Sequence, residues 1–417
     1  MSTTIDNNFL KILIVTPYFY PENFKINDLV TELQRRGHSL SVLTPIPNYP
    51  EGKYFKGYSL FNKRYQFYKN ISIYRVPVIS RGSGNRIRLF LNYISFVIFS
   101  ILPIRKILRK KYNIIFVYSP SPATVGIPAI IIKKILQVPL IFWVHDLWPE
   151  SVKSAGKLNS DIIPKLINPI IKWLYRNSDK VLVSSKGFIK PIIKNGGKEK
   201  DILYFPQWAE PIFNSGNKEI IEIPNVPKNS FKIMFAGNIG EAQDFSSILE
   251  TAKKLKFNKK IHWIIVGGGR KEKWVKEKIN KYQLQNVFHM VGRFPLEKMP
   301  SFYEYADTML ISLKKEYIFS LTVPAKAQSY LASGKPILAM IDGATATLIN
   351  ESKSGLACAA ESPDQLAKNI LKMCSLNNDE IKQMGVNAYN FSQKEFNRER
   401  LISILEELFY KVSYQIK

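Results

Sequence analysis

The chain has 417 residues and a mass of 48.0 kDa, about twice the length of a typical domain, so its length predicts two domains. Hydrophobic residues make up 46% of the chain and no fixed-period repeat or low-complexity tract occurs, which excludes a disordered or repeat protein. The two cysteines, Cys358 and Cys374, have no His or Cys partner at a metal-ligand spacing, which excludes a disulfide framework and a structural zinc site.

Basic residues exceed acidic residues, and the excess is greatest in the first half. The 60 Lys and Arg residues against 33 Asp and Glu residues give a net charge of +27, and residues 1–210 alone hold 31 basic and 12 acidic residues. Such a surface attracts nucleic acid, an anionic membrane face or phosphate-bearing small molecules, and charge alone does not choose among them. The first ten residues lack the basic start and apolar stretch of a secretory signal, so we expect a cytoplasmic protein.

The predicted elements begin with an α/β pattern. Lys11–Thr16 is a short apolar run with β-branched residues, an amphipathic helix follows and ends at Gly37, and Ser39–Thr44 is a second strand. This order predicts a βαβ unit in a parallel sheet. Further strands are predicted at Ile114–Tyr118, Leu140–Val144 and Lys180–Ser184.

A second series of strands and helices begins at Lys232, so we expect a second parallel sheet of the same kind. The join lies near Phe205–Asn214, where two prolines interrupt the periodicity. Glu395–Tyr410 has apolar residues at helical spacing and predicts a closing helix.

The segment Leu89–Ile104 leans toward apolar residues and is flanked by basic ones, namely Arg86, Arg88, Arg105, Lys106, Arg109, Lys110 and Lys111. Spanning a bilayer takes about twenty apolar residues, and this run of 16 is interrupted by Asn92, Ser95, Ser100 and Pro103. We therefore expect no transmembrane helix but a helix in the membrane interface, with its basic flanks on anionic head groups. An ordinary buried helix of the first domain is the alternative.

Polar loops follow the first two predicted strands, where open α/β sheets bind ligands. Pro17–Phe24 lacks the GxGxxG pattern that cradles a dinucleotide, so a dehydrogenase is not supported. Glu22 and Asn23 precede the first helix, where they either meet a polar ligand or cap the helix. Pro45–Gly52 is a stiff, proline-rich loop that suits recognition.

The strongest local signal follows the strand Leu140–Val144. His145, Asp146, Trp148 and Glu150 place an imidazole, two carboxylates and an indole within six residues. A His beside an Asp binds a sugar hydroxyl or transfers a proton near neutral pH, and an indole offers a face for stacking. A purely structural His is the alternative.

Glycine-rich turns mark the second half. Ala236–Gln243 lies between a strand and a helix, and its two glycines leave backbone N–H groups bare for a diphosphate. Gly267–Gly269 repeats this arrangement after the next strand. Lys326 stands at the entry of a later helix, in Leu321–Pro336, where a cation can meet a phosphate.

Five motifs follow one another along the chain: YFYPEN at Tyr18–Asn23, NYPEG at Asn48–Gly52, HDLWPES at His145–Ser151, GNIGEAQD at Gly237–Asp244 and VPAKAQSYLASGKPI at Val323–Ile337. Together they resemble the family 4 glycosyltransferases of the GT-B fold, and within that family the N-acetyl-L-fucosaminyltransferases of bacterial O-antigen and capsule assembly. The resemblance extends from about residue 11 to the end of the chain.

The resemblance implies an α/β architecture with two Rossmann-like domains. It gives an acceptor domain at 1–208, a nucleotide-sugar domain at 209–394, and a helix at 395–417 that returns to the first domain. It implies a retaining transfer, without a cofactor or metal ion, from a UDP-linked donor to a polyprenyl-diphosphate-linked saccharide. The protein is then expected at the inner face of the cell membrane, attached peripherally.

Site residues are implied in both domains. Donor binding is expected from Gly237, Asn238, Gly240, Gln243, Gly268, Arg293, Pro324, Lys326, Gln328 and Ser329, with Lys326 as the first choice for the cation at the diphosphate. Acceptor binding is expected from Glu22, Asn23, Asn48, Tyr49, Glu51 and Trp148. The catalytic candidates are His145, Asp146, Glu150 and Glu316.

The chain departs from the family pattern at the phosphate loops. The glycine pair after the first strand is replaced by Asn23 and Phe24, and the Arg and Lys of the second phosphate loop by Asn238 and Gln243. The phosphate clamp is therefore expected to be reorganised.

The family's paired glutamates are also absent, because Leu321 and Ser329 stand at their positions. Glu316 is a hypothesis for the missing carboxylate. Two other functions stay open: a nucleotide-sugar 2-epimerase of the same fold, which needs no acceptor or membrane, and a non-catalytic nucleic-acid-binding protein.

Overall fold

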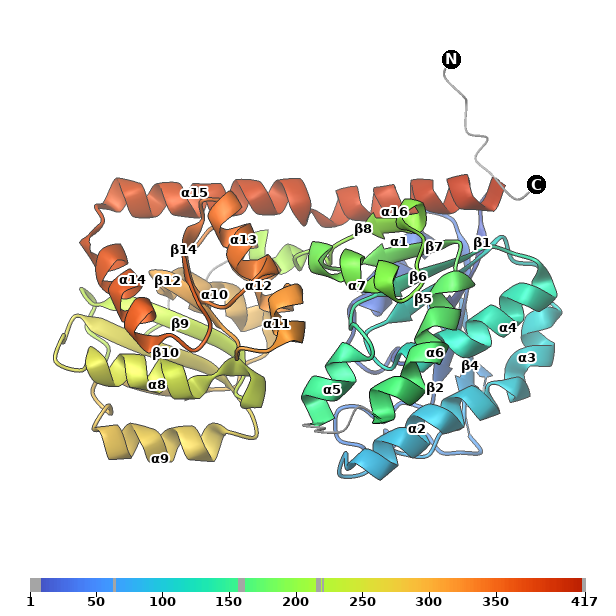
Figure 1. The fold of residues 1–417 in the computed structure, drawn as a ribbon, viewed down its shortest axis with the longest axis horizontal. Helices are drawn as coiled ribbons and strands as arrows, with labels where there is room; N and C mark the ends of the chain where they lie inside the picture. Colours follow the sequence, from blue (N-terminus) through green and yellow to red (C-terminus); the bar gives the residue numbers. More distant parts are fainter. Residues whose placement is uncertain (1–8, 63–64, 157–161, 215–218, 220, 415–417) are drawn as a thin grey trace, which may run out of the picture. The chain divides into compact units, whose positions relative to one another are not determined.

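Two β-sheets carry the fold, one in each of the two units into which the chain divides (Figure 1). The computed structural model describes residues 9–62, 65–156, 162–214, 219 and 221–414, so most of the stretch examined for a secretory signal and the last three residues lie outside it. The first unit takes the chain up to Ser184, Phe188–Phe205 and the residues from Ile402 on. The second takes Ser185–Gly187 and Pro206–Leu401, so the main division follows Phe205 rather than residue 208.

The sheet of the first unit has eight strands in the order β3-β4-β2-β1-β5-β6-β7-β8, and the pairs are parallel except for β3 with β4. Its central strands are continuous apolar runs because helices bury both of their faces. The strands are β1 (Lys11–Val15), β2 (Ser39–Pro45), β3 (Tyr65–Tyr68), β4 (Ile71–Val76), β5 (Ile114–Ser119), β6 (Leu140–Val144), β7 (Lys180–Val183) and β8 (Ile202–Tyr204).

Helices connect these strands and cover the sheet (Figure 1). The first helix shows why they form: it buries Ile26, Leu29, Val30 and Leu33, which recur at the spacing of one helical face. The helices that begin in this unit are α1 (Lys25–Arg35), α2 (Arg86–Phe99), α3 (Ile101–Leu108), α4 (Gly126–Leu136), α5 (Glu150–Gly156), α6 (Ile162–Arg176) and α7 (Ile189–Lys194).

The second sheet has six parallel strands in the order β11-β10-β9-β12-β13-β14. Successive side chains enter two different hydrophobic clusters, since Met234 joins one and Ile233 and Phe235 join the other. The strands are β9 (Phe231–Asn238), β10 (Ile261–Gly268), β11 (Phe288–Gly292), β12 (Thr308–Ser312), β13 (Ile337–Met340) and β14 (Gly355–Cys358).

The helices after β9 are α8 (Phe245–Lys254), α9 (Glu272–Tyr282), α10 (Met299–Tyr305), α11 (Tyr317–Leu321), α12 (Ala325–Ala332), α13 (Ala344–Glu351), α14 (Pro363–Ser375), α15 (Asn378–Glu395) and α16 (Arg398–Tyr414). The prediction of two parallel-sheet domains is therefore confirmed. Strands β3 and β4 are not among the predicted elements; a two-residue turn joins them at Lys69 and Asn70, both with positive φ.

The closing helix contacts the first unit, as the sequence predicts, although it begins at Arg398 rather than Glu395. Phe409 is fully buried and lies 5.3 Å, between ring centroids, from Phe116 of β5. The Glu406 carboxylate bonds to His38 Nε2 at 2.8 Å and accepts from Arg36 Nη1 at 2.8 Å. The end of the chain therefore completes the core of the first unit.

The apolar segment predicted over Leu89–Ile104 is longer in the structure, where α2 and α3 follow one another with only Ser100 between them. The stretch Arg86–Leu108 spans 23 residues with a mean hydropathy of 1.9 in its most apolar window, so by length and composition alone it could cross a membrane. The expectation that the run is too short for a span is therefore wrong. The same length and composition also occur in core helices of soluble proteins.

Asn92, Ser95 and Phe96 of α2 are buried against the protein, whereas most of its other apolar residues face outward. Asn92 Nδ2 donates to the carbonyl of Ile79 at 2.6 Å, and the N–H of Ile79 donates to Ser95 Oγ at 3.0 Å. Apolar side chains on the other side are 38% to 73% exposed, namely Ile87, Phe90, Leu91, Ile94, Ile98, Phe99, Ile101 and Leu102. The polar residues that interrupt the sequence pattern therefore do not interrupt the exposed apolar surface.

Replacing Glu406 by Ala should lower the free energy of unfolding by about 1–3 kcal/mol, because the fully buried His38 side chain loses the partner of its Nε2 atom. Denaturant unfolding followed by circular dichroism measures this. Glu407→Ala, at an exposed position of the same helix, is the control and should change the value by less than about 0.5 kcal/mol. Equal effects of the two variants would contradict the role of α16 in the first unit.

Candidate active site

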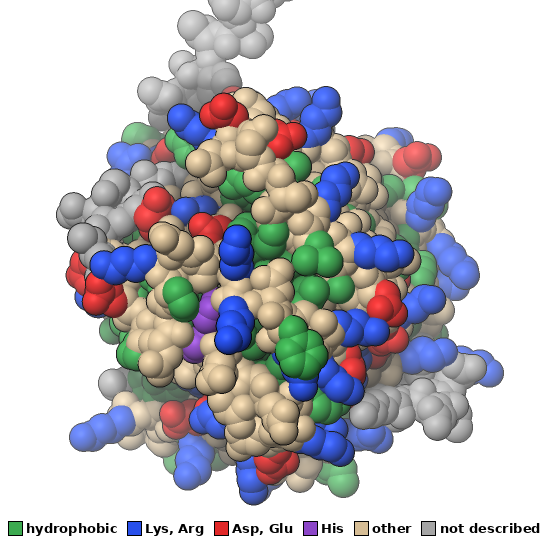
Figure 2. All heavy atoms as spheres, turned by 90° about the vertical axis from the view of Figure 1, so that its left-hand side faces the viewer, with side chains coloured by type: hydrophobic (Ala, Val, Ile, Leu, Met, Phe, Trp, Pro, Cys, Tyr) green, Lys and Arg blue, Asp and Glu red, His purple; other side chains and the backbone are tan. Residues whose placement is uncertain are grey.

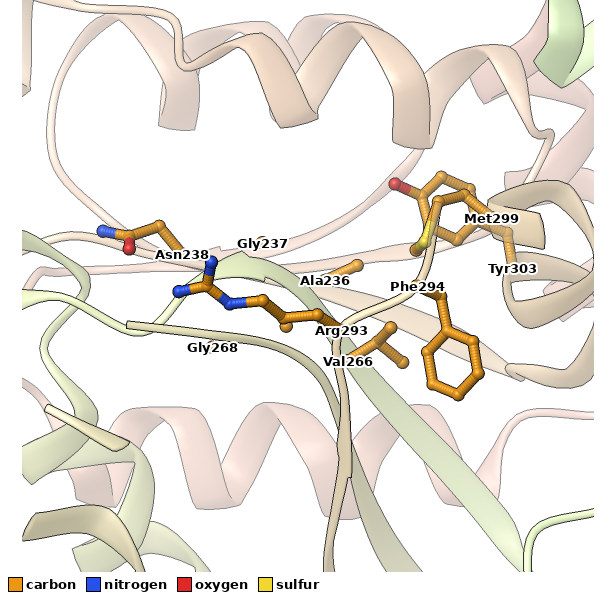
Figure 3. Close-up of a pocket in the computed structure, with 10 residues that line it drawn as sticks. Ala236, Gly237, Asn238, Val266, Gly268, Arg293, Phe294, Met299 and Tyr303 are labelled. Carbon is orange, nitrogen blue, oxygen red and sulfur yellow. The ribbon is translucent and has the colours of Figure 1, made fainter. Parts of the chain in front are cut away.

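The backbone at the ends of β9 and β10 forms the floor of a pocket of about 380 Å³ in the second unit (Figure 3). Gly237 and Gly267 pair there with φ values of +139° and +140°. A Cβ at Gly267 would lie 1.9 Å from the carbonyl oxygen of Gly237, so only glycine permits this approach. A ligand can therefore lie directly on the backbone.

Side chains line two sides of this pocket. Figure 3 shows the Arg293 guanidinium pointing toward Asn238, and Phe294, Met299 and Tyr303 lie on the other side. Arg293 passes so close to Gly268 that a Cβ there would lie 2.5 Å from the Arg293 Nε. The pocket thus joins a cation and bare backbone to an apolar wall, which suits a ligand with an anionic part and a flat ring.

Lys326 lies under this floor. Its Nζ is shielded from solvent, has no hydrogen-bond partner among the described residues, and lies 3.6 Å from the Phe235 ring centroid. A Cβ at Gly237 would lie 3.5 Å from the Nζ, so the ammonium reaches the pocket floor where the glycine has no side chain. Burial lowers the pKa of Lys326 to about 7, and a nearby anion would favour its charged form.

Tyr330 holds α12, and with it Lys326, against β9. Its hydroxyl accepts from the N–H of Ala236 at 2.8 Å and donates to the carbonyl of Ala236 at 3.0 Å. Both bonds are fully buried, so the ammonium is fixed next to Gly237.

His145 occupies the end of β6 in the first unit. Its ring centroid lies 4.4 Å from that of Tyr118 and 4.0 Å from that of Trp143, and both ring nitrogens are buried without a partner among the described residues. Burial and the nearby charge of Lys25 hold the pKa of His145 well below its ordinary value. The imidazole is therefore neutral at pH 7, with one nitrogen able to accept and the other to donate a hydrogen bond.

The other residues of the HDLWPES motif shape the turn after β6. The Asp146 carboxylate accepts a hydrogen bond from Ser151 Oγ, and burial raises the pKa of Asp146. Trp148 is 7% exposed and its Nε1 donates to Ser121 Oγ at 3.3 Å. Glu150 begins α5 with one carboxylate oxygen shielded and unpaired among the described residues, and burial raises its pKa.

Two family models match the two halves of the chain. The model described as Glycosyltransferase Family 4 matches residues 26–206, and that described as Glycosyl transferases group 1 matches residues 216–391. The chain belongs to the group 1/family 4 glycosyltransferases. The predicted enzyme class is thus confirmed, and the nucleic-acid-binding alternative receives no support. Nucleic-acid-binding proteins often gather their basic residues in a patch or stripe. On the face of the second unit that Figure 2 shows, Lys and Arg side chains are instead scattered.

Curated relatives extend the match. A protein of Pseudomonas aeruginosa named as a glycosyltransferase, WbjE, is 27% identical over 61% of this chain and 65% of its own length. WcaI of Escherichia coli, named for colanic acid biosynthesis, is 23% identical over 78% of this chain and 82% of its own length. The match thus spans just under two thirds of WbjE.

Solved structures share the GT-B fold with this glycosyltransferase. The structure of HepE from Anabaena in complex with UDP has a TM-score of 0.70, 14% identity, and covers 96% of this chain and all of its own. WaaG, described as a glycosyltransferase involved in lipopolysaccharide biosynthesis, has a TM-score of 0.66 and 12% identity over 96% of this chain and 99% of its own. The predicted fold class is confirmed.

Several predicted donor residues of this glycosyltransferase have other partners. The N–H of Gly240 donates to Gln243 Oε1 at 3.1 Å, so neither group is free for a phosphate. The Gln328 side chain is 1% exposed, with its amide against the carbonyls of Pro324 and Ala325. These interactions shape the loop and the helix in the ligand-free chain, and donor contacts from Gly240, Gln243 and Gln328 stay predictions.

Two more predicted residues stand elsewhere in the second unit. Ser329 Oγ donates to Glu210 Oε2 at 3.1 Å, so its hydroxyl binds the segment before β9 rather than the pocket. Glu316 is half-buried and precedes α11, and it does not line the pocket. Of the predicted donor residues, Gly237, Asn238, Gly268 and Arg293 line the pocket, and Lys326 lies beneath it.

Predicted acceptor residues of the first unit are largely structural. The Glu22 side chain is 2% exposed, and its Oε1 accepts from the N–H groups of Asn48 at 2.9 Å and Tyr49 at 2.8 Å. Burial raises the pKa of Glu22 to about 7. Asn48 Nδ2 donates to the carbonyl of Ile46 at 2.9 Å. Glu22 and Asn48 thus join two loops instead of offering polar atoms to a substrate.

Trp148 also fails as a free stacking surface, because it is buried and its ring lies 6.1 Å from that of Tyr93. Tyr49 is 39% exposed and packs on Tyr18. Asn23 and Glu51 are exposed and stay candidates for acceptor contacts.

The buried Arg75 of β4, which donates to the carbonyls of Tyr20 and Pro45, is not among the predicted residues. Phe294, Met299 and Tyr303 are not among them either, because they follow β11 without a recognisable motif. No group of three potential metal ligands occurs among the described residues, and metal independence stays a prediction.

Replacing Lys326 by Met should raise the free energy of unfolding of the ligand-free protein below pH 7 by about 5 kcal/mol, because each pKa unit between the folded and the unfolded chain corresponds to about 1.4 kcal/mol. The pKa is about 7 in the folded chain and 10.5 ordinarily, so the unfolded chain binds more protons between these values. The wild type therefore gains stability as the pH rises from 7 to 10.5, and the advantage of the variant vanishes over that range. Denaturant unfolding at several pH values measures this.

Lys281→Met, at an exposed position of α9, is the matched control and should leave the stability within about 0.5 kcal/mol of the wild type. A Lys326→Met protein that is less stable than the wild type at pH 6 would show that the ammonium has a compensating partner.

Proposed function

We propose that the protein transfers a sugar from a UDP-linked donor to a polyprenyl-diphosphate-linked saccharide at the inner face of the cell membrane. The observation that supports the donor part of this proposal is the buried ammonium of Lys326, which has no hydrogen-bond partner among the described residues and lies beside a pocket floor of bare glycine backbone. A diphosphate bound on this floor would place its negative charge next to the ammonium of Lys326.

The pocket supports a nucleotide diphosphate as the leaving group. Lys326 and Arg293 would stabilise the negative charge that develops on the diphosphate as its bond to the sugar breaks. The apolar wall of Phe294 and Met299 would take the base. HepE was solved with UDP and with UDP-glucose, which favours a UDP-linked donor here.

His145 is the residue that we place at the reacting sugar. In the proposed retaining reaction, the bond between the anomeric carbon and the diphosphate breaks. The acceptor hydroxyl oxygen bonds to that carbon from the same side, and the hydroxyl proton passes to an oxygen of the departing diphosphate. A neutral imidazole with two unpaired nitrogens can orient a sugar hydroxyl by accepting or donating. Asp146 holds the turn that presents it, and Glu150 has an unpaired oxygen for a further hydroxyl.

The sugar and the pathway rest on the motifs. The resemblance favours N-acetyl-L-fucosamine as the transferred sugar, in O-antigen or capsule assembly. The printed names of WcaI and WaaG, which refer to colanic acid and lipopolysaccharide biosynthesis, point to surface polysaccharides in the same way.

The helices α2 and α3 support the part of the proposal that concerns a lipid-linked acceptor. Their exposed apolar side chains and the basic residues that follow them fit the interface of an anionic membrane, where the apolar surface enters the acyl boundary and the lysines meet head groups. A protein that works on a lipid-linked substrate gains from such an attachment.

Turnover tests the proposed function. Purified protein is mixed with UDP- and GDP-sugars, with and without a polyprenyl-diphosphate N-acetylhexosamine, and nucleotide release is measured with and without a chelator. We expect acceptor-dependent UDP release that the chelator leaves unchanged, and a loss of about 100-fold or more in kcat for His145→Ala. His289→Ala, in the second unit, serves as the control.

Acceptor-independent turnover would favour the 2-epimerase, and no turnover with any donor would reject the transferase. A change of only a few fold in His145→Ala would make His145 a packing residue.

Membrane attachment has its own test. Exchanging Phe90 and Ile98 for Asp should weaken binding to phosphatidylglycerol vesicles about tenfold or more, because both side chains lie on the exposed apolar side of α2. Sedimentation with vesicles measures binding, and added salt should weaken it in the wild type.

The matched control exchanges Ile131 and Ile135 of α4 for Asp, since these are also exposed apolar residues of the first unit. Equal losses in both double variants would show that α2 has no special part in attachment.

A further inference from the structure

Arg81 is a half-buried cation of the first unit that lies between β4 and α2. Its Nη1 donates to the Tyr18 hydroxyl at 2.5 Å and its Nη2 to the Tyr93 hydroxyl at 3.5 Å. The guanidinium carbon lies 5.2 to 5.9 Å from the ring centroids of Tyr18, Tyr49 and Tyr93. Within the part of the chain that the structure describes, its side-chain partners are thus phenols and aromatic rings, and no carboxylate pairs with it.

The backbone around Arg81 is fixed from two directions. The N–H of Arg81 donates to Asn48 Oδ1 at 3.3 Å, and the N–H of Gly82 donates to the carbonyl of Gly52 at 2.9 Å. A Cβ at Gly52 would lie 1.8 Å from the Gly82 carbonyl oxygen, so the two loops touch through glycine. On the other side, α2 holds both backbone groups of Ile79. The guanidinium is therefore carried by a rigid loop.

The Arg81 guanidinium and its tyrosine partners suit the binding of a phosphate group. A guanidinium offers five N–H groups in a planar fork, and two phenol hydroxyls use only part of them. The tyrosine rings stabilise the cation without neutralising it. The fork matches the oxygens of a phosphate in a bidentate way, which a lysine cannot do.

Arg81 lies close to two further features that a ligand could contact, the helix α2 and the turn of the HDLWPES motif. The loop leads into α2, which has exposed apolar side chains. Tyr93 of the same helix contacts both Arg81, by a hydrogen bond, and Trp148 of the HDLWPES motif, with 6.1 Å between the two rings. A molecule along this path meets an apolar surface, then a cation, then the turn that carries His145.

We propose that Arg81 binds the diphosphate of the lipid-linked acceptor and that Tyr18 and Tyr93 orient its guanidinium. This inference rests on the lipid-linked acceptor of the proposed function. A polyprenyl chain, a diphosphate and a sugar follow one another in the same order as α2, Arg81 and the turn of His145.

Vesicle binding by the full chain tests the proposal without any turnover. Phosphatidylcholine vesicles carry either undecaprenyl diphosphate or phosphatidylglycerol at equal total negative charge. The wild type should bind the diphosphate vesicles more tightly. Arg81→Gln should weaken binding to them about tenfold, and binding to phosphatidylglycerol vesicles less than twofold. Arg81→Lys keeps the charge but lacks the fork, and should fall between the two.

Arg400→Gln removes the same charge from an exposed position of α16 and should leave both affinities unchanged. Equal weakening on both vesicle types by Arg81→Gln would make Arg81 a general head-group contact and overturn the proposal. Equal affinity of the wild type for the two vesicles would overturn it as well, with membrane attachment intact. No wild-type binding to either vesicle would reject the membrane part of the proposed function too.

Discussion

The buried ammonium of Lys326 is the constraint on which the pocket of the second unit depends. A buried ammonium with no hydrogen-bond partner among the described residues destabilises the folded chain, and the two hydrogen bonds of Tyr330 to Ala236 hold it in place by fixing α12 against β9. The approach of Gly237 and Gly267 leaves this charge next to the pocket floor. A bound anion would supply the missing interaction. The buried charge that lowers the stability of the free protein would then raise its affinity for the anion.

In the first unit, by contrast, the buried carboxylate of Glu22 has hydrogen-bond partners. Glu22 accepts backbone N–H groups from the loop that carries Asn48 and Tyr49, and Arg75 holds the carbonyls on either side. Glu22 and Asn48 of these loops thus point inward and fix the backbone, whereas Asn23 and Glu51 are exposed and aromatic rings surround Arg81. Because Glu22 and Arg75 bind backbone groups of neighbouring loops, they hold these loops together.

The elements and the places of the sites could be predicted, but the directions of the side chains could not. Strands such as β6 are apolar runs between turn residues, which a single sequence shows, whereas β8 has only three residues and no pattern. Lys326 could be predicted as a donor-binding residue because it lies within the recognisable motif Val323–Ile337. Ser329 follows on the same helix but turns to Glu210, and Glu22 binds a loop 26 residues later, so their roles depend on tertiary partners that local sequence does not reveal.

The helix α16 joins the beginning of the chain to its end. Residues from Ile402 on belong to the first unit, and Glu406 and Phe409 pack on His38 and Phe116. During synthesis, the strands of the first unit leave the ribosome long before these residues exist. Part of the core of the first unit therefore stays uncovered until the whole second unit has been synthesised, so the first unit cannot complete its folding before the second unit has left the ribosome.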